Sequence, residues 1–200
     1  MHTSSPQLEM SLASLDRLPE AELADGYRLR TYRTGDLAAW GRLVSECIGG
    51  QYDEAACRES LLMDTPQFAP EDLFFLEKDG EAVGTACALR KHAPGEGPGY
   101  LHMVAVTAAH RGQRLGRPLV IAALRRFGDL GYRDVILSTD DFRLAAIRTY
   151  LDLGFLPVRS HESHAIRWRE VYEKLGVGAQ HAVPSREEAG DATLSDEPSA

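Results

Sequence analysis

The sequence predicts an α/β fold with a mixed sheet (α+β), in a chain long enough for one domain with polar tails. The chain has 200 residues, 44% of them hydrophobic, which is enough for one packed core. Strand-like and helix-like segments alternate along it. Two apolar strands in the second half are separated by one long helix, the usual pattern of a parallel pair joined by a crossover.

Residue periodicity assigns the elements in order. In the first half we predict a strand at 27–33, helices at 36–48 and 53–63, and a hairpin of strands at 73–78 and 81–89. In the second half we predict strands at 100–106, 134–139 and 155–159, and helices at 117–130, 142–153 and 165–175. Near the N-terminus, Leu12, Leu15 and Leu18 have the spacing of a short helical turn that packs on the domain surface.

Charge is distributed unevenly and suggests the domain limits. The net charge is −8, and it lies in two acidic tails, so the middle of the chain is neutral overall. We therefore expect a polar lead at 1–26, a domain at 27–176 and an acidic, disordered tail at 177–200. No basic face extends beyond one arginine-bearing turn in the middle of the chain, which argues against nucleic acid as a partner.

The stretch from Tyr100 to Gly131 departs from this acidic character. Between Gly97 and Gly128 there are five arginines and no acidic residue. An apolar strand leads into a turn with Gly112 and Gly116 and then into a helix. Helix N-termini expose unpaired N–H groups and the positive end of the helix dipole. The sequence therefore predicts a site for phosphate or pyrophosphate at this turn.

Several other classes of site and location are disfavoured. Neither the P-loop motif nor the glycine-rich dinucleotide motif is present. No apolar run is long enough for a transmembrane helix, no signal peptide is visible, and the three cysteines form no CxxC pair, so we expect a cytoplasmic protein without a membrane partner. His161 and His164 lack further ligands, and we expect no metal.

The central turn resembles motif A of the GNAT N-acetyltransferase superfamily. In that family a strand ending in V-A-V is followed by a turn of the form [QR]-x-x-G-x-[GA]. Here Val104-Ala105-Val106 ends the strand, Arg111 takes the first place of the turn and Gly116 the last. Arg114 stands where the middle glycine of the motif is most often found.

A second resemblance lies downstream, at the spacing that the family implies. Ala146, Tyr150 and the pair Gly154-Phe155 are similar to the family's A-x-x-x-Y-x-x-x-G-F pattern. Arg143 stands where the family usually has Asn. The predicted helix at 165–175 falls where the family usually has its seventh strand, so the sequence leaves open whether a seventh strand is present or is replaced by this helix.

The resemblance implies a GNAT-like acyltransferase fold and acetyl transfer from acetyl-CoA to an acceptor, usually an amine. Tyr150 would be the general acid that protonates the CoA sulfur. Main-chain N–H groups and basic side chains would hold the coenzyme, and the residues implied are Val104, Ala105, Val106, Arg111, Gly112, Gln113, Arg114, Leu115, Gly116, Arg117 and Arg143.

Two questions remain open at the level of sequence. The general base is one of His102, which alternation places on the same strand face as Val104 and Val106, Asp140, Asp141 or a bound water. The function is acetyl transfer to a small molecule or peptide amine, or, as the alternative, a regulatory CoA-binding module without catalysis. The acceptor and the oligomeric state, for which a homodimer is one candidate, are not fixed by the sequence.

Overall fold

The computed structural model describes residues 6–177, so all but the first residue of the predicted acidic tail at 177–200 lies outside the described residues. The chain divides into two compact units. We call Ala13–Ile136 the central unit. The terminal unit combines Met1–Leu12 with Leu137–Ala200, of which residues 6–12 and 137–177 are described.

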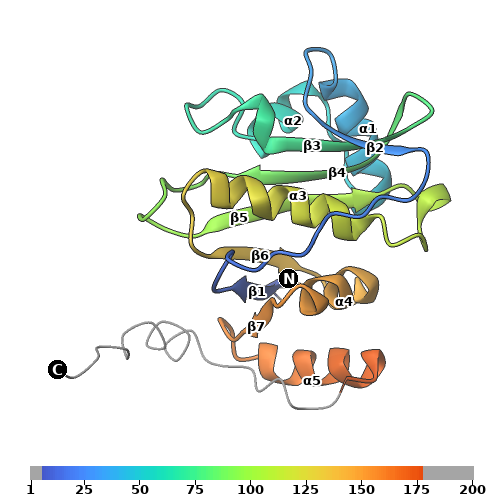
Figure 1. Ribbon diagram of the computed structural model, residues 1–200. Coiled ribbons are helices and arrows are strands. Elements are labelled where there is room, and N and C mark those ends of the chain that lie inside the picture. The colour runs from blue at the N-terminus through green and yellow to red at the C-terminus, as the bar shows by residue number, and fades with distance from the viewer. Residues whose placement is uncertain (1–5, 178–200) are drawn as a thin grey trace. The chain divides into compact units, whose positions relative to one another are not determined.

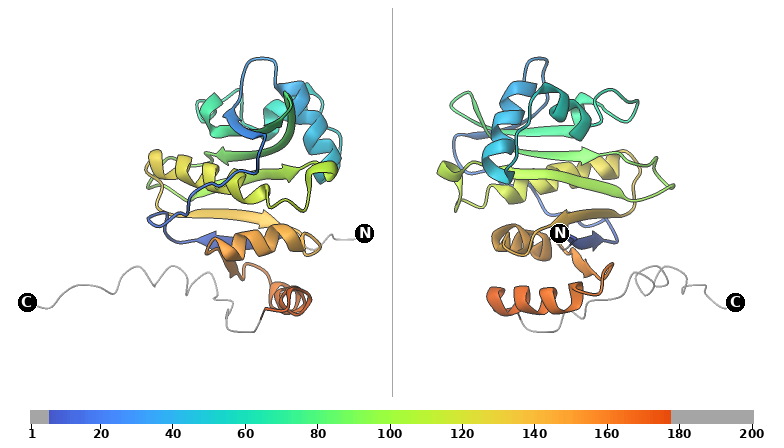
Figure 2. Two further views of the ribbon diagram at one scale, coloured as in Figure 1. Left: turned by 45° about the vertical axis from the view of Figure 1, so that its right-hand side comes forward. Right: turned by 180° about the vertical axis from the view of Figure 1, so that it is seen from behind.

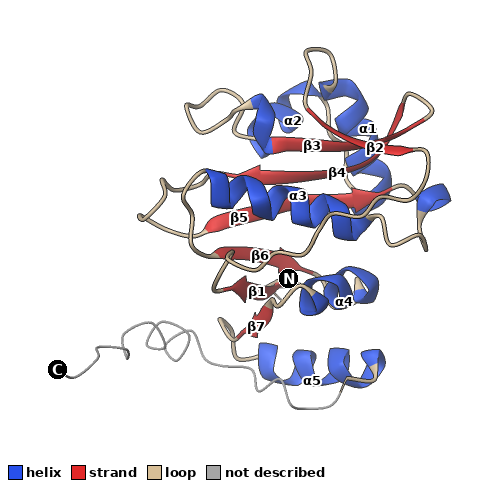
Figure 3. Ribbon diagram, in the orientation of Figure 1, coloured by secondary structure: helices blue, strands red, loops and turns tan. Residues whose placement is uncertain are grey.

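The central unit is a mixed sheet with helices (Figures 1 and 3). Its strands follow the order β2-β3-β4-β5-β6, of which β2 to β5 are antiparallel and β5 pairs with β6 in parallel. Its elements are β2 (Tyr27–Thr31), α1 (Leu37–Ile48), α2 (Glu54–Ser60), the 3-10 helix η1 (Pro70–Asp72), β3 (Leu73–Lys78), β4 (Glu81–Leu89), β5 (Gly99–Val106), the 3-10 helix η2 (Ala108–His110), α3 (Gly116–Asp129) and the first two residues of β6 (Val135–Thr139).

Helices cover both faces of the central sheet, with α1 and α2 on one side and α3 on the other (Figures 1 and 2). The first side holds a buried cluster made of Trp40, Val44, Cys57, Leu61, Leu73, Phe75, Cys87 and Leu89. On the other side, α3 packs closely at Gly99, where an added Cβ would lie 2.5 Å from the Phe127 ring. Because Gly99 begins β5, this contact fixes α3 against the strand that leads to its own N-terminus.

The terminal unit contains β1 (Leu8–Leu12), the remaining residues of β6, α4 (Leu144–Asp152), β7 (Leu156–Val158) and α5 (His164–Leu175). Its strands follow the order β6-β1-β7, and β1 runs antiparallel to β7. Leu8, Met10 and Leu12 are buried at alternate positions, as expected for a strand with one face toward the core. The N-terminal segment therefore supplies a strand to a unit otherwise built from the end of the chain.

Strand β1 corrects two expectations. The predicted helical turn around Leu12 is wrong, because Leu12 ends a strand whose two-residue alternation begins at Leu8. A seventh strand is also present among residues 6–177, and it comes from the N-terminus and not from residues 160–176, where the predicted helix forms as α5. Within those residues, no helix is long and apolar enough to span a membrane.

Candidate functional site

Strand β5 carries an irregularity beside the predicted coenzyme-binding residues. Thr85 of β4 faces Ala105, but Cys87 faces His102, so two residues of β5 stand opposite Ala86. Met103 has a φ of 49°, in the left-handed region. A β-bulge of this kind leaves one residue outside the ladder and re-aims the backbone. The bulge also interrupts the alternation that placed His102 on one face with Val104 and Val106.

The turn that follows β5 has two left-handed residues. Gly112 has a φ of 81° and Arg114 a φ of 57°, and α3 begins at Gly116. Turns in which left-handed residues alternate with others direct their N–H groups into anion-binding concavities. The N-cap residue of α3 is Leu115, whose side chain makes no capping hydrogen bond, and the first turn of the helix holds no acid. The turn is therefore suited to bind an anionic group through its main chain.

Two contacts anchor the start of this turn. Nε of Arg111 donates a hydrogen bond to the carbonyl oxygen of Val106 at 3.0 Å. The N–H of Ala108 donates to Oε1 of Glu46, on α1, at 3.3 Å. The segment between β5 and α3 is thereby tied both to its own strand and to a helix of the central unit.

Arg114 adopts a backbone conformation that favours glycine, which explains why the family motif most often has glycine there. A Cβ atom in the left-handed region costs about 1–2 kcal/mol. We expect Arg114→Gly to be more stable than Arg114→Ala by about 1 kcal/mol, after allowing for the greater unfolded-state entropy of glycine. Urea unfolding of the two variants measures the difference, and neither carries the guanidinium group.

The matched control for this prediction is Gly112→Ala, which introduces a Cβ atom at the other left-handed position. Gly112→Ala should destabilise the protein by a similar amount, because glycine adopts a positive φ without strain and alanine does not. Equal stability of Arg114→Gly and Arg114→Ala would contradict the assignment of strain to this residue.

His102 is held on the α2 side of β5. Its Nε2 lies 3.0 Å from Oγ of Ser60, and its ring centroid is 5.7 Å from that of Tyr100. Burial lowers the pKa of His102 to about 4, and the positive charge of Lys91 acts in the same direction. The imidazole is therefore neutral at physiological pH, and so low a pKa gives little driving force for taking a proton from an ammonium group.

Tyr150 lies on α4 in the terminal unit. Its side chain is buried, with only 6% of the residue exposed, and its ring centroid is 5.8 Å from that of Phe155. Burial raises the pKa of Tyr150 above its ordinary value, and the charge of Arg143 opposes this in part. The phenol is consequently protonated at neutral pH, which is the state that a general acid needs.

The polar residues after β6 are paired with one another. Arg143 is the N-cap residue of α4, and its Nε donates to Oδ2 of Asp140 at 2.8 Å. Asp140 also accepts a hydrogen bond from the Gln7 side chain. Hydrogen bonding to Arg167 lowers the pKa of Asp141. A carboxylate held ionised in this way is a weaker base, which makes Asp141 less suited to remove a proton.

Sequence reasoning missed two polar groupings in the central unit. Asp72 lies buried between Arg90 and Arg126, and Tyr27 contacts His110 and Gln113. No spacing pattern could have revealed them, because each joins residues far apart in the chain. Within residues 6–177, no three His, Cys, Asp or Glu side chains are arranged to hold a metal ion.

The profile of the acetyltransferase (GNAT) family matches residues 37–155, which is more than half of the chain. The chain belongs to the GNAT acetyltransferase family. The matched range of this GNAT chain includes β5, the turn, α3 and Tyr150. The likeness noted for the two sequence motifs is therefore confirmed at the level of the family.

Similar proteins include named acetyltransferases. Mycothiol acetyltransferase of Thermobispora bispora is 34% identical over 146 residues, which cover 69% of this chain and 49% of that protein. N-acetyltransferase 8B of Rattus norvegicus is 34% identical over 119 residues, which cover 58% of this chain and 50% of that protein. The chain thus spans about half the length of these curated relatives.

A solved structure supports the fold assignment. The GCN5-related N-acetyltransferase from Sphaerobacter thermophilus aligns with a TM-score of 0.61 at 23% sequence identity, over 76% of this chain and 49% of that one. At this level of identity the likeness establishes the fold alone. The predicted GNAT-like mixed α/β fold is confirmed.

Proposed function

We propose that this chain transfers an acetyl group from acetyl-CoA to a primary amine of a small molecule or peptide. The observation that carries the proposal is the turn between β5 and α3, with its left-handed residues Gly112 and Arg114, in a member of the GNAT family. We assign the pyrophosphate of the coenzyme to the main-chain N–H groups of residues 111–117. The arginines of this stretch, Arg111, Arg114 and Arg117, add positive charge where the phosphates bind.

The transfer requires one bond to form and one to break. The amine nitrogen attacks the thioester carbonyl carbon, the C–S bond breaks, and the CoA thiolate takes up a proton. We assign the pantetheine arm and the carbonyl oxygen to main-chain N–H groups of Val104, Ala105 and Val106, next to the bulge. Donors fixed in place before the reaction stabilise the developing oxyanion without reorganising.

We assign the proton for the departing sulfur to Tyr150. Its burial and raised pKa support this role, because the phenol stays protonated across the neutral range. Arg143 stands at the coenzyme-contacting position of the family motif. Its side chain forms an ion pair with the carboxylate of Asp140.

The proton of the attacking amine leaves through bound water in this proposal. The low pKa of His102 and its contact with Ser60 make the imidazole a weak general base. A hydrogen-bonding role toward the acceptor or toward that water is better suited to a neutral imidazole, which can both donate and accept. A relay of this kind needs no dedicated side chain.

One observation favours the alternative of a CoA-binding module without catalysis. Arg143 replaces the usual Asn and is paired with Asp140, so it is less free to meet a coenzyme. Such a module would keep the anion-binding turn and would still bind CoA.

The deciding experiment measures release of free CoA thiol from acetyl-CoA across a panel of primary amines of small molecules and peptides. Amine-dependent thiol release supports the enzyme. A rise in melting temperature with acetyl-CoA, without thiol release for any amine, would support the binding module. No effect of acetyl-CoA on the melting temperature and no thiol release would contradict both.

A further inference from the structure

Tyr27, the first residue of β2, reaches the turn that precedes α3. Its hydroxyl oxygen lies 2.8 Å from Nδ1 of His110 and 3.2 Å from Oε1 of Gln113. The rings of Tyr27 and His110 meet edge to face, with centroids 5.7 Å apart and planes at 89°. One side chain therefore contacts the turn at two points, on either side of Arg111 and Gly112.

With the Gln113 amide oriented as in the structure, one arrangement of protons satisfies both contacts. A phenol has a single proton, and here it is donated to the amide oxygen of Gln113. The remaining contact is then satisfied only if Nδ1 of His110 carries a proton and donates it to the phenol oxygen. In this arrangement the three side chains form a directed chain, from His110 through Tyr27 to Gln113, and Nδ1 of His110 carries a proton.

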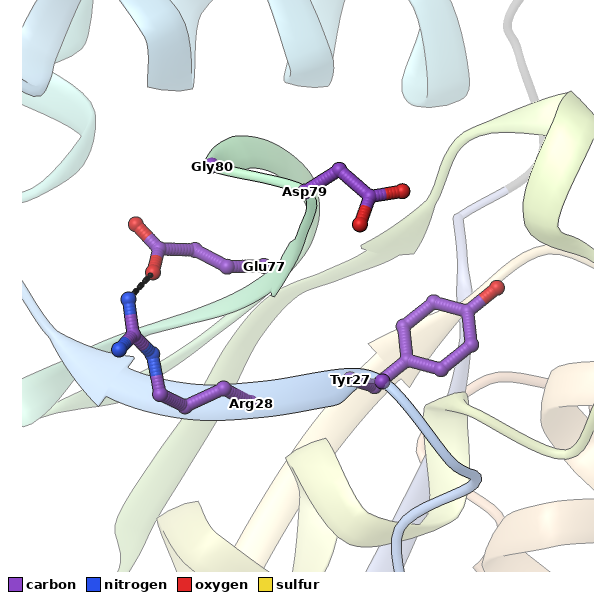
Figure 4. A pocket seen from close by; sticks show the side chains of 6 residues that line it. Tyr27, Arg28, Glu77, Asp79 and Gly80 are labelled. Carbon is purple, nitrogen blue, oxygen red and sulfur yellow. Dashed lines mark hydrogen bonds and ion pairs between the residues drawn. The ribbon is translucent and has the colours of Figure 1, made fainter.

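Tyr27 is itself held from the sheet. It pairs with Lys78 across β2 and β3, and the ammonium nitrogen of Lys78 lies 4.9 Å from the centroid of its ring. The residue also borders a shallow pocket shared with Arg28, Glu77 and Asp79, but its ring is directed away from the Arg28–Glu77 pair (Figure 4). The sheet therefore holds the backbone of Tyr27, while its hydroxyl group contacts the turn.

The Tyr27 contact reaches a part of the turn that the other anchors do not. Glu46 holds Ala108, and Arg111 holds the end of its own strand. Gln113 lies between the two left-handed residues, Gly112 and Arg114, in the segment whose main-chain N–H groups we assign to the anion. Fixing Gln113 lowers the conformational entropy that the turn would lose when an anion binds.

We infer that Tyr27 is a positioning residue for the coenzyme: it pre-organises the anion-binding turn through His110 and Gln113. The inference rests on the proposed function, because it assumes that the turn binds CoA. Tyr27 touches no reacting atom in this account. Its loss should weaken coenzyme binding and leave the chemical step intact.

The test replaces Tyr27 with phenylalanine, which keeps the ring and removes the hydroxyl group. We expect the Kd for CoA by calorimetry and the KM for acetyl-CoA to rise about threefold to tenfold, the range set by one or two hydrogen bonds. The kcat and the KM for the acceptor should not change. The matched control is Tyr32→Phe, on the segment just after β2, where the ring packs on Phe68.

A spectroscopic readout separates this role from a general structural one. Nitrogen NMR of the His110 ring should show Nδ1 protonated in the unaltered protein and in Tyr32→Phe, and a change of tautomer in Tyr27→Phe. Gln113→Ala provides a second variant on the exposed turn. If the chain of contacts is real, combining it with Tyr27→Phe should raise the Kd for CoA by less than the product of the single effects.

Unchanged coenzyme affinity in Tyr27→Phe would overturn the inference, as would a fall in kcat without a rise in KM. Strictly multiplicative effects of Tyr27→Phe and Gln113→Ala would overturn it as well. Failure of the unaltered protein to bind CoA is a different result. It would refute the proposed function, and the inference would fall with it.

Discussion

Replacing Asp72 with alanine is expected to lower the free energy of unfolding by about 3 kcal/mol. Asp72 ends η1, and its side chain is only 3% exposed. Nε of Arg126, on α3, donates to Oδ1 at 2.7 Å, and Nε of Arg90, just after β4, forms an ion pair with Oδ2 at 2.8 Å. One carboxylate thus joins three parts of the central unit.

The size of this effect follows from what remains after the substitution. Removing one member of a buried ion pair typically costs about 3–5 kcal/mol, because its partner is left charged and unpaired. The side chains of Arg90 and Arg126 are 22% and 26% exposed, so both keep some contact with water. This places the expected loss at the lower end of the range.

Urea unfolding of Asp72→Ala measures the loss. The matched control is Asp64→Ala, which breaks an ion pair with Arg58 at the surface, where the Asp64 side chain is 65% exposed. Exposed pairs contribute little to stability, so the control should unfold like the unaltered protein. If Asp72→Ala also unfolds at the unaltered midpoint, Asp72 does not link the three elements energetically.

Replacing Tyr150 with phenylalanine is expected to lower kcat by about 10² to 10³-fold, if the proposed function holds. General acid catalysis contributes roughly 10² to 10⁴-fold to a rate, and water can protonate part of the departing thiolate when the phenol is gone. Phenylalanine preserves the buried ring and its contact with Phe155. The Kd for CoA should therefore stay within about twofold of the unaltered value.

Steady-state kinetics with acetyl-CoA and an accepted amine provide the measurement. Tyr172→Phe is the matched control, because Tyr172 is another buried tyrosine of the terminal unit, on α5. It should keep its kcat. Loss of activity in both variants would indicate a general effect of removing buried hydroxyl groups, and full activity in Tyr150→Phe would remove Tyr150 from the mechanism.

Local sequence patterns predicted most of the elements. The helical spacing of Leu37, Trp40 and Val44 marked α1, and the Asp79-Gly80 turn marked the β3–β4 hairpin. The central strand, turn and helix were also predicted, because their apolar residues and glycines act within a few positions of one another. Family motifs carried the assignment of coenzyme and activity.

Features that depend on distant residues were not predictable. The position of β1 depends on pairing with β7. Its alternating apolar residues are few, and the leucines that follow have the spacing of a helix, which led to the wrong prediction. The bulge at Met103 arises from the register between β4 and β5. The positive φ of Arg114 was not predicted either, because arginine rarely adopts the left-handed conformation. The hydrogen bonds of Tyr27 to His110 and Gln113 depend on the turn before α3 lying next to the start of β2, which is 83 residues before His110 in the chain.

The placement of β1 has a consequence for the order of folding. Its pairing with β7 joins Glu9 to Val158, near opposite ends of the described chain. During synthesis the first strand emerges long before its two neighbours, β6 and β7, exist. Leu8, Met10 and Leu12 therefore stay exposed to solvent or to chaperones until those strands follow. The central unit, whose residues are consecutive, can form earlier. The N-terminal strand then closes the terminal unit as one of the last steps.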